Sequence, residues 1–149
     1  MKQGILERSE GVPKFERLTV GDVMHQGVVT CPTETPLRAV ARMMTGHRIH
    51  AVVVFDEESD DVSGPGLWGV VSDPDLISAA NAGEIEDRTA GGTAVTPVVM
   101  IERSDTLGHA AQLMSEHQIT HLLVVDPRTE RPVGILSTLD LARALTDAG

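Results

Sequence analysis

The chain has few aromatic residues, one cysteine and no long apolar run. Its 149 residues include no tyrosine, two phenylalanines and one tryptophan, which leaves almost no side chains on which single-stranded bases could stack. The single cysteine excludes an intrachain disulfide. No apolar run approaches the roughly 18 residues that a membrane span requires. Twenty-two acidic residues against twelve basic ones give a net charge of −10, which disfavours nucleic acid and anionic membranes as partners.

Sequence signals for export and for common enzyme classes are missing as well. The first residues are charged and lack the apolar stretch of a secretory signal, so we expect a soluble, cytoplasmic protein. The sequence contains no phosphate-binding P-loop, no dinucleotide-binding glycine pattern and no nucleophile elbow. We therefore expect a protein that is not an enzyme. Its apolar content of 41% is sufficient for a compact domain with a core.

What the chain does contain is an internal repeat. Residues 18–56 align with residues 88–126 without a gap, and eleven of the 39 aligned pairs are identical. Further on, 69–80 aligns with 134–145, after a loop that is five residues longer in the first copy. Copies of this size are too short for ordinary independent domains, so we expect the two to pack together. The predicted boundaries are an N-terminal arm at 1–17, a first repeat at 18–80, a linker at 81–87 and a second repeat at 88–149.

The apolar patterns of the two copies predict the same order of secondary structure. Leu37 begins an apolar pattern at helical spacing and Leu107 begins the equivalent one, with Thr35 and Asp105 as the expected N-caps. Continuous apolar runs then predict buried strands, and shorter apolar runs lead into two final helices. These segments are 51–55 and 121–125 for the buried strands, 67–71 and 132–136 for the shorter strands, and 75–80 and 140–145 for the final helices. The sequence therefore predicts an α/β fold of two pseudo-symmetric strand-helix-strand-strand-helix repeats packed as one module.

Each copy ends in the pattern Gly, two apolar residues, Ser, two variable residues, Asp. The pattern occupies residues 69–75 in the first copy and 134–140 in the second. Together with the repeated order of elements, with the histidine-containing segments 47–54 and 117–124, and with Met24 after Gly21-Asp22-Val23, it resembles the cystathionine-beta-synthase (CBS) domain pair. The resemblance covers about Leu18 to Leu145.

The resemblance implies a disc-like, non-enzymatic module that requires no cofactor. Its inter-repeat clefts are expected to hold an adenosine-containing regulatory ligand such as AMP, ADP, ATP or S-adenosylmethionine. Such modules form homodimers through their helices and regulate an attached or separate effector protein. A structural homodimerisation module without bound ligand is the alternative.

The Ser-x-x-Asp part of the pattern has two physical interpretations. A carboxylate can accept from both ribose hydroxyls, and a serine at the start of a helix lies where backbone N–H groups and the helix dipole favour a phosphate. Alternatively, the serine and the acid form a capping box that satisfies the helix start without any ligand. Capping alone gives no reason for the glycine of the pattern.

The candidate ligand residues divide by chemistry. Asp75 and Asp140 are the ribose candidates. The phosphate candidates are Ser72, Ser137 and Thr138, with His50 and His121 as possible further contacts. The adenine would lie among aliphatic side chains, whose simpler role is in the core. These are Val28, Val29, Ile49, Val98, Val99 and Ile119.

The two copies differ inside the pattern. The first has Asp73 and Pro74 where the second has Thr138 and Leu139, and the extra carboxylate should repel a di- or triphosphate. We expect Asp140, Ser137 and Thr138 to form the better site, with the Asp75 site weak, empty or suited to a less charged adenosine. The six histidines form no metal-ligand signature, so we expect no metal site.

Overall fold

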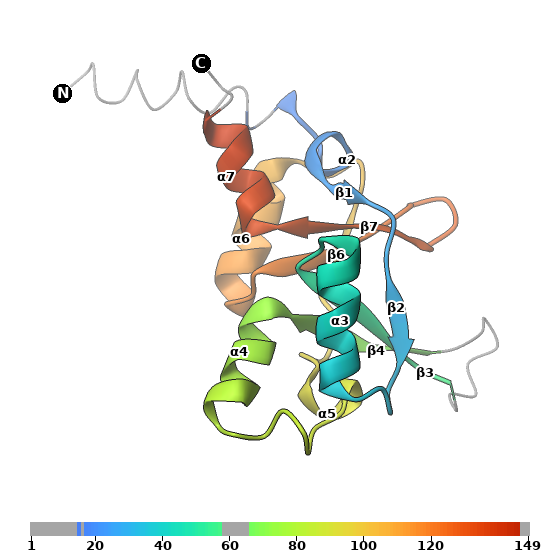
Figure 1. Ribbon diagram of the computed structural model, residues 1–149. Helices are drawn as coiled ribbons and strands as arrows, with labels where there is room; N and C mark the ends of the chain where they lie inside the picture. The colour runs from blue at the N-terminus through green and yellow to red at the C-terminus, as the bar shows by residue number, and fades with distance from the viewer. Residues whose placement is uncertain (1–14, 16, 58–65, 147–149) are drawn as a thin grey trace. The chain divides into compact units, whose positions relative to one another are not determined.

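The computed structural model describes residues 15, 17–57 and 66–146 (Figure 1). The predicted arm at 1–17, apart from Phe15 and Arg17, and most of the longer loop of the first copy lie outside the described residues. The chain divides into two compact units, which we call unit 1 and unit 2. Unit 1 combines the N-terminal part through Gly27 with the chain from Val99 onwards, and unit 2 is Val28–Val98.

Unit 1 is a four-stranded sheet with helices. Its elements are α2 (Val20–Val23), β1 (His25–Gln26), β5 (Met100–Glu102), α6 (Leu107–His117), β6 (His121–Val125), β7 (Pro132–Ser137) and α7 (Thr138–Thr146). The strand order is β1-β7-β6-β5. β5 runs parallel to β6, and the other two pairings are antiparallel.

Unit 2 repeats this plan with a three-stranded sheet. Its elements are β2 (Thr30–Pro32), α3 (Leu37–His47), β3 (Ala51–Asp56), β4 (Gly66–Ser72), α4 (Asp73–Asn81) and α5 (Ala90–Thr93). The strand order is β2-β3-β4, with β2 parallel to β3 and β3 antiparallel to β4. An isolated antiparallel bridge from Val95 to Val70 stands where β1 pairs with β7 in unit 1. The predicted α/β fold with two strand-helix-strand-strand-helix repeats is confirmed.

The two compact units do not coincide with the two sequence repeats, because the first segment of each repeat packs with the rest of the other repeat. β1 belongs to the first copy, yet it pairs with β7 of the second copy, His25 opposite Ile135. Val95 belongs to the second copy, yet it bridges to β4 of the first. We call the segments 18–27 and 88–98 the lead-ins. Each unit thus consists of one copy's lead-in packed on the other copy's body.

The glycine of each repeated pattern has a structural cause in this exchange. A Cβ atom on Gly134 would lie 2.5 Å from the carbonyl oxygen of His25, and one on Gly69 would lie 2.6 Å from that of Val95. Only a residue without a side chain lets the lead-in approach the strand so closely. The glycine of the pattern therefore has a packing cause that is separate from the capping of the helix.

The two central helices form where the apolar spacing predicts them. Leu37, Val40 and Met44 are buried on α3, as are Leu107, Ala110 and Met114 on α6. The expected caps were one residue too early, since the N-caps are Pro36 and Thr106. The Thr106 hydroxyl accepts from the His109 N–H at 3.1 Å, whereas the Asp105 carboxylate accepts from the Glu102 N–H at 3.1 Å in the preceding turn.

Each unit has its own apolar core. In unit 1 the buried cluster includes Leu107, Leu122 and Leu136, and in unit 2 it includes Leu37 and Val52, all fully buried. The central strands β3 and β6 contribute residues buried on consecutive positions, as expected for strands covered on both faces. None of the helices among the described residues combines the length and apolar character needed to cross a membrane.

Candidate functional site

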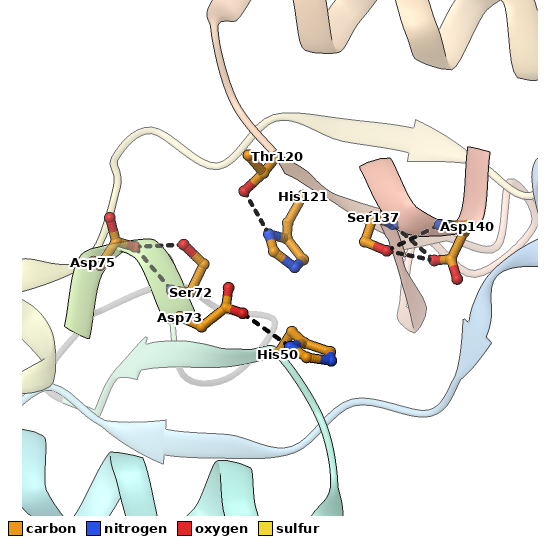
Figure 2. A network of polar contacts seen from close by, with 8 residues as sticks. All are labelled: His50, Ser72, Asp73, Asp75, Thr120, His121, Ser137 and Asp140. Atoms are coloured by element: carbon orange, nitrogen blue, oxygen red, sulfur yellow. Dashed lines mark hydrogen bonds and ion pairs between the residues drawn. The ribbon is translucent and has the colours of Figure 1, made fainter. Parts of the chain in front are cut away.

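The repeated Ser-x-x-Asp residues stand at the junction of a strand and a helix in both units. In unit 2, β4 ends at Ser72, which is the N-cap of α4. The Ser72 N–H and hydroxyl both donate to Oδ2 of Asp75, at 2.8 and 3.0 Å (Figure 2). These bonds satisfy the helix start in the manner of a capping box. Ser72 is buried, and Asp75 is partly exposed.

Unit 1 contains the equivalent arrangement at the start of α7. The Ser137 N–H and hydroxyl donate to Oδ2 of Asp140 at 2.8 and 3.1 Å (Figure 2), and the Asp140 N–H donates to the Ser137 hydroxyl oxygen at 3.2 Å. The capping interpretation therefore describes both helix starts as they are. All the bonds that the two serines donate fall on Oδ2, so Oδ1 of each aspartate takes no part in them.

The residue after each serine makes the same backbone bond in both units. Asp73 N–H donates to the carbonyl of His50, and Thr138 N–H donates to that of Thr120, each at 3.0 Å. These N–H groups are thereby used within the fold, so a phosphate at α7 would have to rely on other donors. The hydroxyl of the exposed Thr138 is one such donor.

The side chains beside the two helix starts form different pairs. In unit 2, Nδ1 of His50 lies 2.9 Å from Oδ2 of Asp73. In unit 1, Nδ1 of His121 lies 2.8 Å from the hydroxyl oxygen of Thr120 (Figure 2). The sequence interpretation considered His50 and His121 as phosphate contacts and did not foresee either pair. Aligning the two copies shows that 73 corresponds to 138 and 50 to 120, but which side chains meet is decided by the tertiary fold.

The fold and the repeated pattern agree with a family model. The family model described as "CBS domain" matches the chain twice, at residues 20–82 and 92–147. The chain belongs to the CBS-domain family. Both matches together make it a tandem CBS pair, as the sequence resemblance indicates.

Three known proteins provide comparisons. Homoserine O-acetyltransferase from Methanocorpusculum labreanum is 34% identical over 86% of this chain, which spans only 25% of that relative's length. Hypoxic response protein 1 from Mycobacterium tuberculosis is 26% identical over 87% of this chain and 86% of its own. The CBS domain pair of protein MJ0100, crystallised with 5′-methylthioadenosine and S-adenosyl-L-methionine, shares the fold with a TM-score of 0.72. Its sequence identity is 21%, and the match covers 88% of this chain and 98% of that one.

The aliphatic residues that were predicted to surround the adenine lie in both units. Ile49 packs against the core of unit 2, while Val99 and Ile119 pack against that of unit 1. Val29 and Val99 extend the edge strands, because their carbonyls accept from the Val53 and Leu123 N–H groups at 2.9 and 3.1 Å. Val28 and Val98 are half-buried members of unit 2. Ile49, Val99 and Ile119 therefore have a packing role whether or not an adenine also contacts them.

Other polar groups of the CBS pair have structural explanations. His47 and His117 lie in the last turns of α3 and α6, where a positive charge is favourable. Burial raises the pKa of the Cys31 thiol, partly opposed by a hydrogen bond with Thr35, which disfavours the reactive thiolate. Within residues 15, 17–57 and 66–146, no three His, Cys, Asp or Glu side chains are grouped so that they could hold a metal ion.

Proposed function

We propose that this CBS pair is a non-enzymatic regulatory module that binds an adenosine-containing ligand at its Ser-x-x-Asp helix starts. The candidate ligands are AMP, ADP, ATP and S-adenosylmethionine. The observation that supports the proposal most directly is that each aspartate is held in place through Oδ2 while Oδ1 takes no part in the box. A fixed carboxylate with an oxygen to spare suits recognition of a ribose hydroxyl. The ligands crystallised with the CBS pair of protein MJ0100 belong to the same chemical class.

The residues of unit 1 take distinct roles in this proposal. Oδ1 of Asp140 accepts from the ribose, and the exposed Thr138 hydroxyl donates to a phosphate. Ser137 fixes the carboxylate, and Ile119 offers a half-buried aliphatic surface to the base. In unit 2, Asp75, Ser72 and Ile49 take the equivalent roles. In this proposal an effector protein, attached or separate, responds to the bound state.

The alternative is a structural module without ligand, and it has a specific observation in its favour. Both capping boxes are complete as they stand, so the serine and aspartate need no ligand to account for them. A thermal-shift series with adenosine nucleotides separates the two functions. A ligand at 100 times its dissociation constant stabilises the folded state by about 2.7 kcal/mol, whereas the structural module would show no shift.

The Asp140→Ala variant tests the ribose role. We expect it to weaken nucleotide binding by about tenfold or more, because the hydrogen bonds that a charged acceptor makes to a ligand are each worth about 1.5–3 kcal/mol. Isothermal titration with AMP and with S-adenosylmethionine measures the loss. The substitution also removes a cap, so its effect on stability needs a matched comparison.

Asp22→Ala provides this comparison within the same unit. The Thr19 N–H donates to Oδ2 of Asp22 at 2.8 Å, and this bond, together with one from the Thr19 side chain, lowers the pKa of Asp22. Asp22 thus closes a capping box at α2, outside the Ser-x-x-Asp pattern. We expect Asp22→Ala to lower stability by about 0.5–2 kcal/mol and to leave ligand affinity unchanged. Equal losses of affinity in both variants would count against a ribose contact by Asp140.

We also propose that the module forms a homodimer through its final helices. Both helices expose apolar side chains at the same three repeat positions, a set that we call the final-helix stripes. The stripes consist of Pro74, Ile77 and Ala80 on α4 and Leu139, Ala142 and Leu145 on α7. Ile77 and Leu145 are 68% and 59% exposed. Scattered exposed apolar residues are ordinary, but the recurrence of the stripe in both copies favours a covered face.

Sedimentation velocity tests the dimer. We expect the wild type to sediment as a dimer and the Leu145→Glu variant to sediment as a monomer, because a buried unpaired carboxylate is costly at an apolar interface. Ser115→Glu introduces the same charge at an exposed position of α6 and should leave the dimer intact. A wild type that stays monomeric at all concentrations, or a Leu145→Glu variant that stays dimeric, would contradict this use of the stripes.

A further inference from the structure

The two helix starts form a natural matched pair that differs in charge at the residue after the serine. Asp73 and Thr138 each follow the serine, and each donates its backbone N–H to the residue before a central strand at 3.0 Å. Both serines bond to the aspartate three residues on. The backbone frame is therefore the same, and the side chain at this position is a carboxylate in unit 2 and a hydroxyl in unit 1.

In unit 2 the carboxylate of Asp73 already has an imidazole partner beside the helix start. Its Oδ2 lies 2.9 Å from Nδ1 of His50 (Figure 2). The side chains of Asp73 and His50 are 46% and 63% exposed. The residue equivalent to His50 is Thr120, whose hydroxyl pairs with His121 instead. A phosphate arriving at α4 would thus meet a carboxylate, and the imidazole that could have contacted it is engaged with that carboxylate.

The charge at the two helix ends differs accordingly. The first turn of α4 carries two carboxylates, Asp73 and Asp75, whereas that of α7 carries Asp140 alone. Carboxylates in the first turn are favoured by the positive end of the helix dipole, the same feature that a bound phosphate would use. In unit 2 the negative charge of Asp73 therefore lies at the helix end where the negative charge of a ligand phosphate would be favoured.

From this difference we infer that Asp73 is a specificity-determining residue that restricts the unit 2 site to adenosine derivatives without a phosphate. Such ligands are a neutral nucleoside thioether or a cationic sulfonium nucleoside. The site of unit 1, with Thr138 at the same position, accepts the phosphate of AMP. This inference rests on the proposed function, since it assigns a ligand class to each of the two proposed sites.

Isothermal titration of an Asp140→Ala variant tests the unit 2 site by itself. The three probes are AMP, 5′-methylthioadenosine and S-adenosylmethionine. We expect AMP to bind at least about tenfold more weakly than 5′-methylthioadenosine, a difference of about 1.4 kcal/mol. Adding Asp73→Thr should strengthen AMP binding by about tenfold while changing the affinity for the neutral thioether by less than about threefold, because only the phosphate carries a charge that the carboxylate repels.

Titration with S-adenosylmethionine shows whether the Asp73 carboxylate attracts a positively charged ligand or only fails to repel it. If the Asp73 carboxylate attracts the sulfonium, Asp73→Thr weakens this ligand while leaving 5′-methylthioadenosine unchanged. The reciprocal substitution Thr138→Asp, made in an Asp75→Ala chain, should weaken AMP at the unit 1 site by about tenfold. Asp87→Thr removes one carboxylate from an exposed loop position of unit 2 and serves as the control for net charge, with the ratio of the AMP and thioether affinities unchanged.

The outcomes distinguish this inference from the proposed function. An unchanged ratio of AMP to thioether affinity in the Asp73→Thr variant, with both ligands still binding, overturns the specificity role and leaves the proposed function standing. An equal change of that ratio in Asp87→Thr also overturns it, because the effect would then come from overall charge. Failure of these three probes, and of ADP and ATP as well, to bind the wild type overturns the proposed function, and the specificity role with it.

Discussion

The Gly134→Ala variant is expected to destabilise the protein by about 1–3 kcal/mol, the range for overpacking a close contact. The new Cβ would lie 2.5 Å from the carbonyl oxygen of His25 and 2.8 Å from Sδ of Met24. The first of these atoms belongs to the backbone of β1, which cannot move away without breaking its pairing with β7. Chemical denaturation of the variant and the wild type measures the difference.

Gly46→Ala is the matched control, and its expected effect has the opposite sign. Gly46 lies in α3, and a Cβ there would have no atom within 4 Å apart from its chain neighbours and the backbone of its own helix. Alanine in place of an unobstructed helical glycine stabilises by about 0.4–1 kcal/mol, chiefly because the unfolded chain has less freedom to lose. If both variants shifted stability in the same direction, the close approach of the lead-in would not be the reason for the glycine in the repeated pattern.

The sequence predicted the elements of this fold because each copy confirms the other. Apolar spacing from Leu37 and from Leu107 gave both central helices, and the continuous apolar runs gave β3 and β6 with at most one residue of difference at an end. The two final helices begin two residues earlier than predicted, directly after Ser72 and Ser137. A serine that caps a helix makes the next residue its first, so the pattern itself contained the correct boundary.

The exchange of the lead-ins could not be predicted from the repeat. A sequence repeat shows which segments resemble each other but not which copy's body each lead-in packs on. The glycines gave an indirect signal, because Gly69 and Gly134 both stand inside strands where a glycine weakens the strand unless something approaches closely. The pair of His50 and Asp73 was equally hidden. It depends on a strand start and a helix start, 23 residues apart, meeting in the fold.

Truncation of the repeat-equivalent leucines is expected to give the largest losses of stability. Leu37 and Leu107 are the first residues of α3 and α6, each is fully buried, and each belongs to the core of its own unit. Leu37→Ala and Leu107→Ala should each cost about 2–5 kcal/mol, because the lost apolar contact is joined by the cost of the cavity left behind. A loss of this size is a large fraction of the stability of a typical domain, so unfolding should be measured at low temperature and low denaturant.

The control for these losses of stability is a truncation at an exposed apolar position. Met100 on β5 is 51% exposed, and Met100→Ala should change stability by less than about 0.5 kcal/mol. Leu37 and Leu107 occupy equivalent positions in the two copies. Similar losses of stability would therefore show that each core depends to the same degree on the first leucine of its helix. A loss at only one of them would mean that the other core relaxes to fill its cavity, and the pseudo-symmetry of the backbone would then not extend to the energetics of packing.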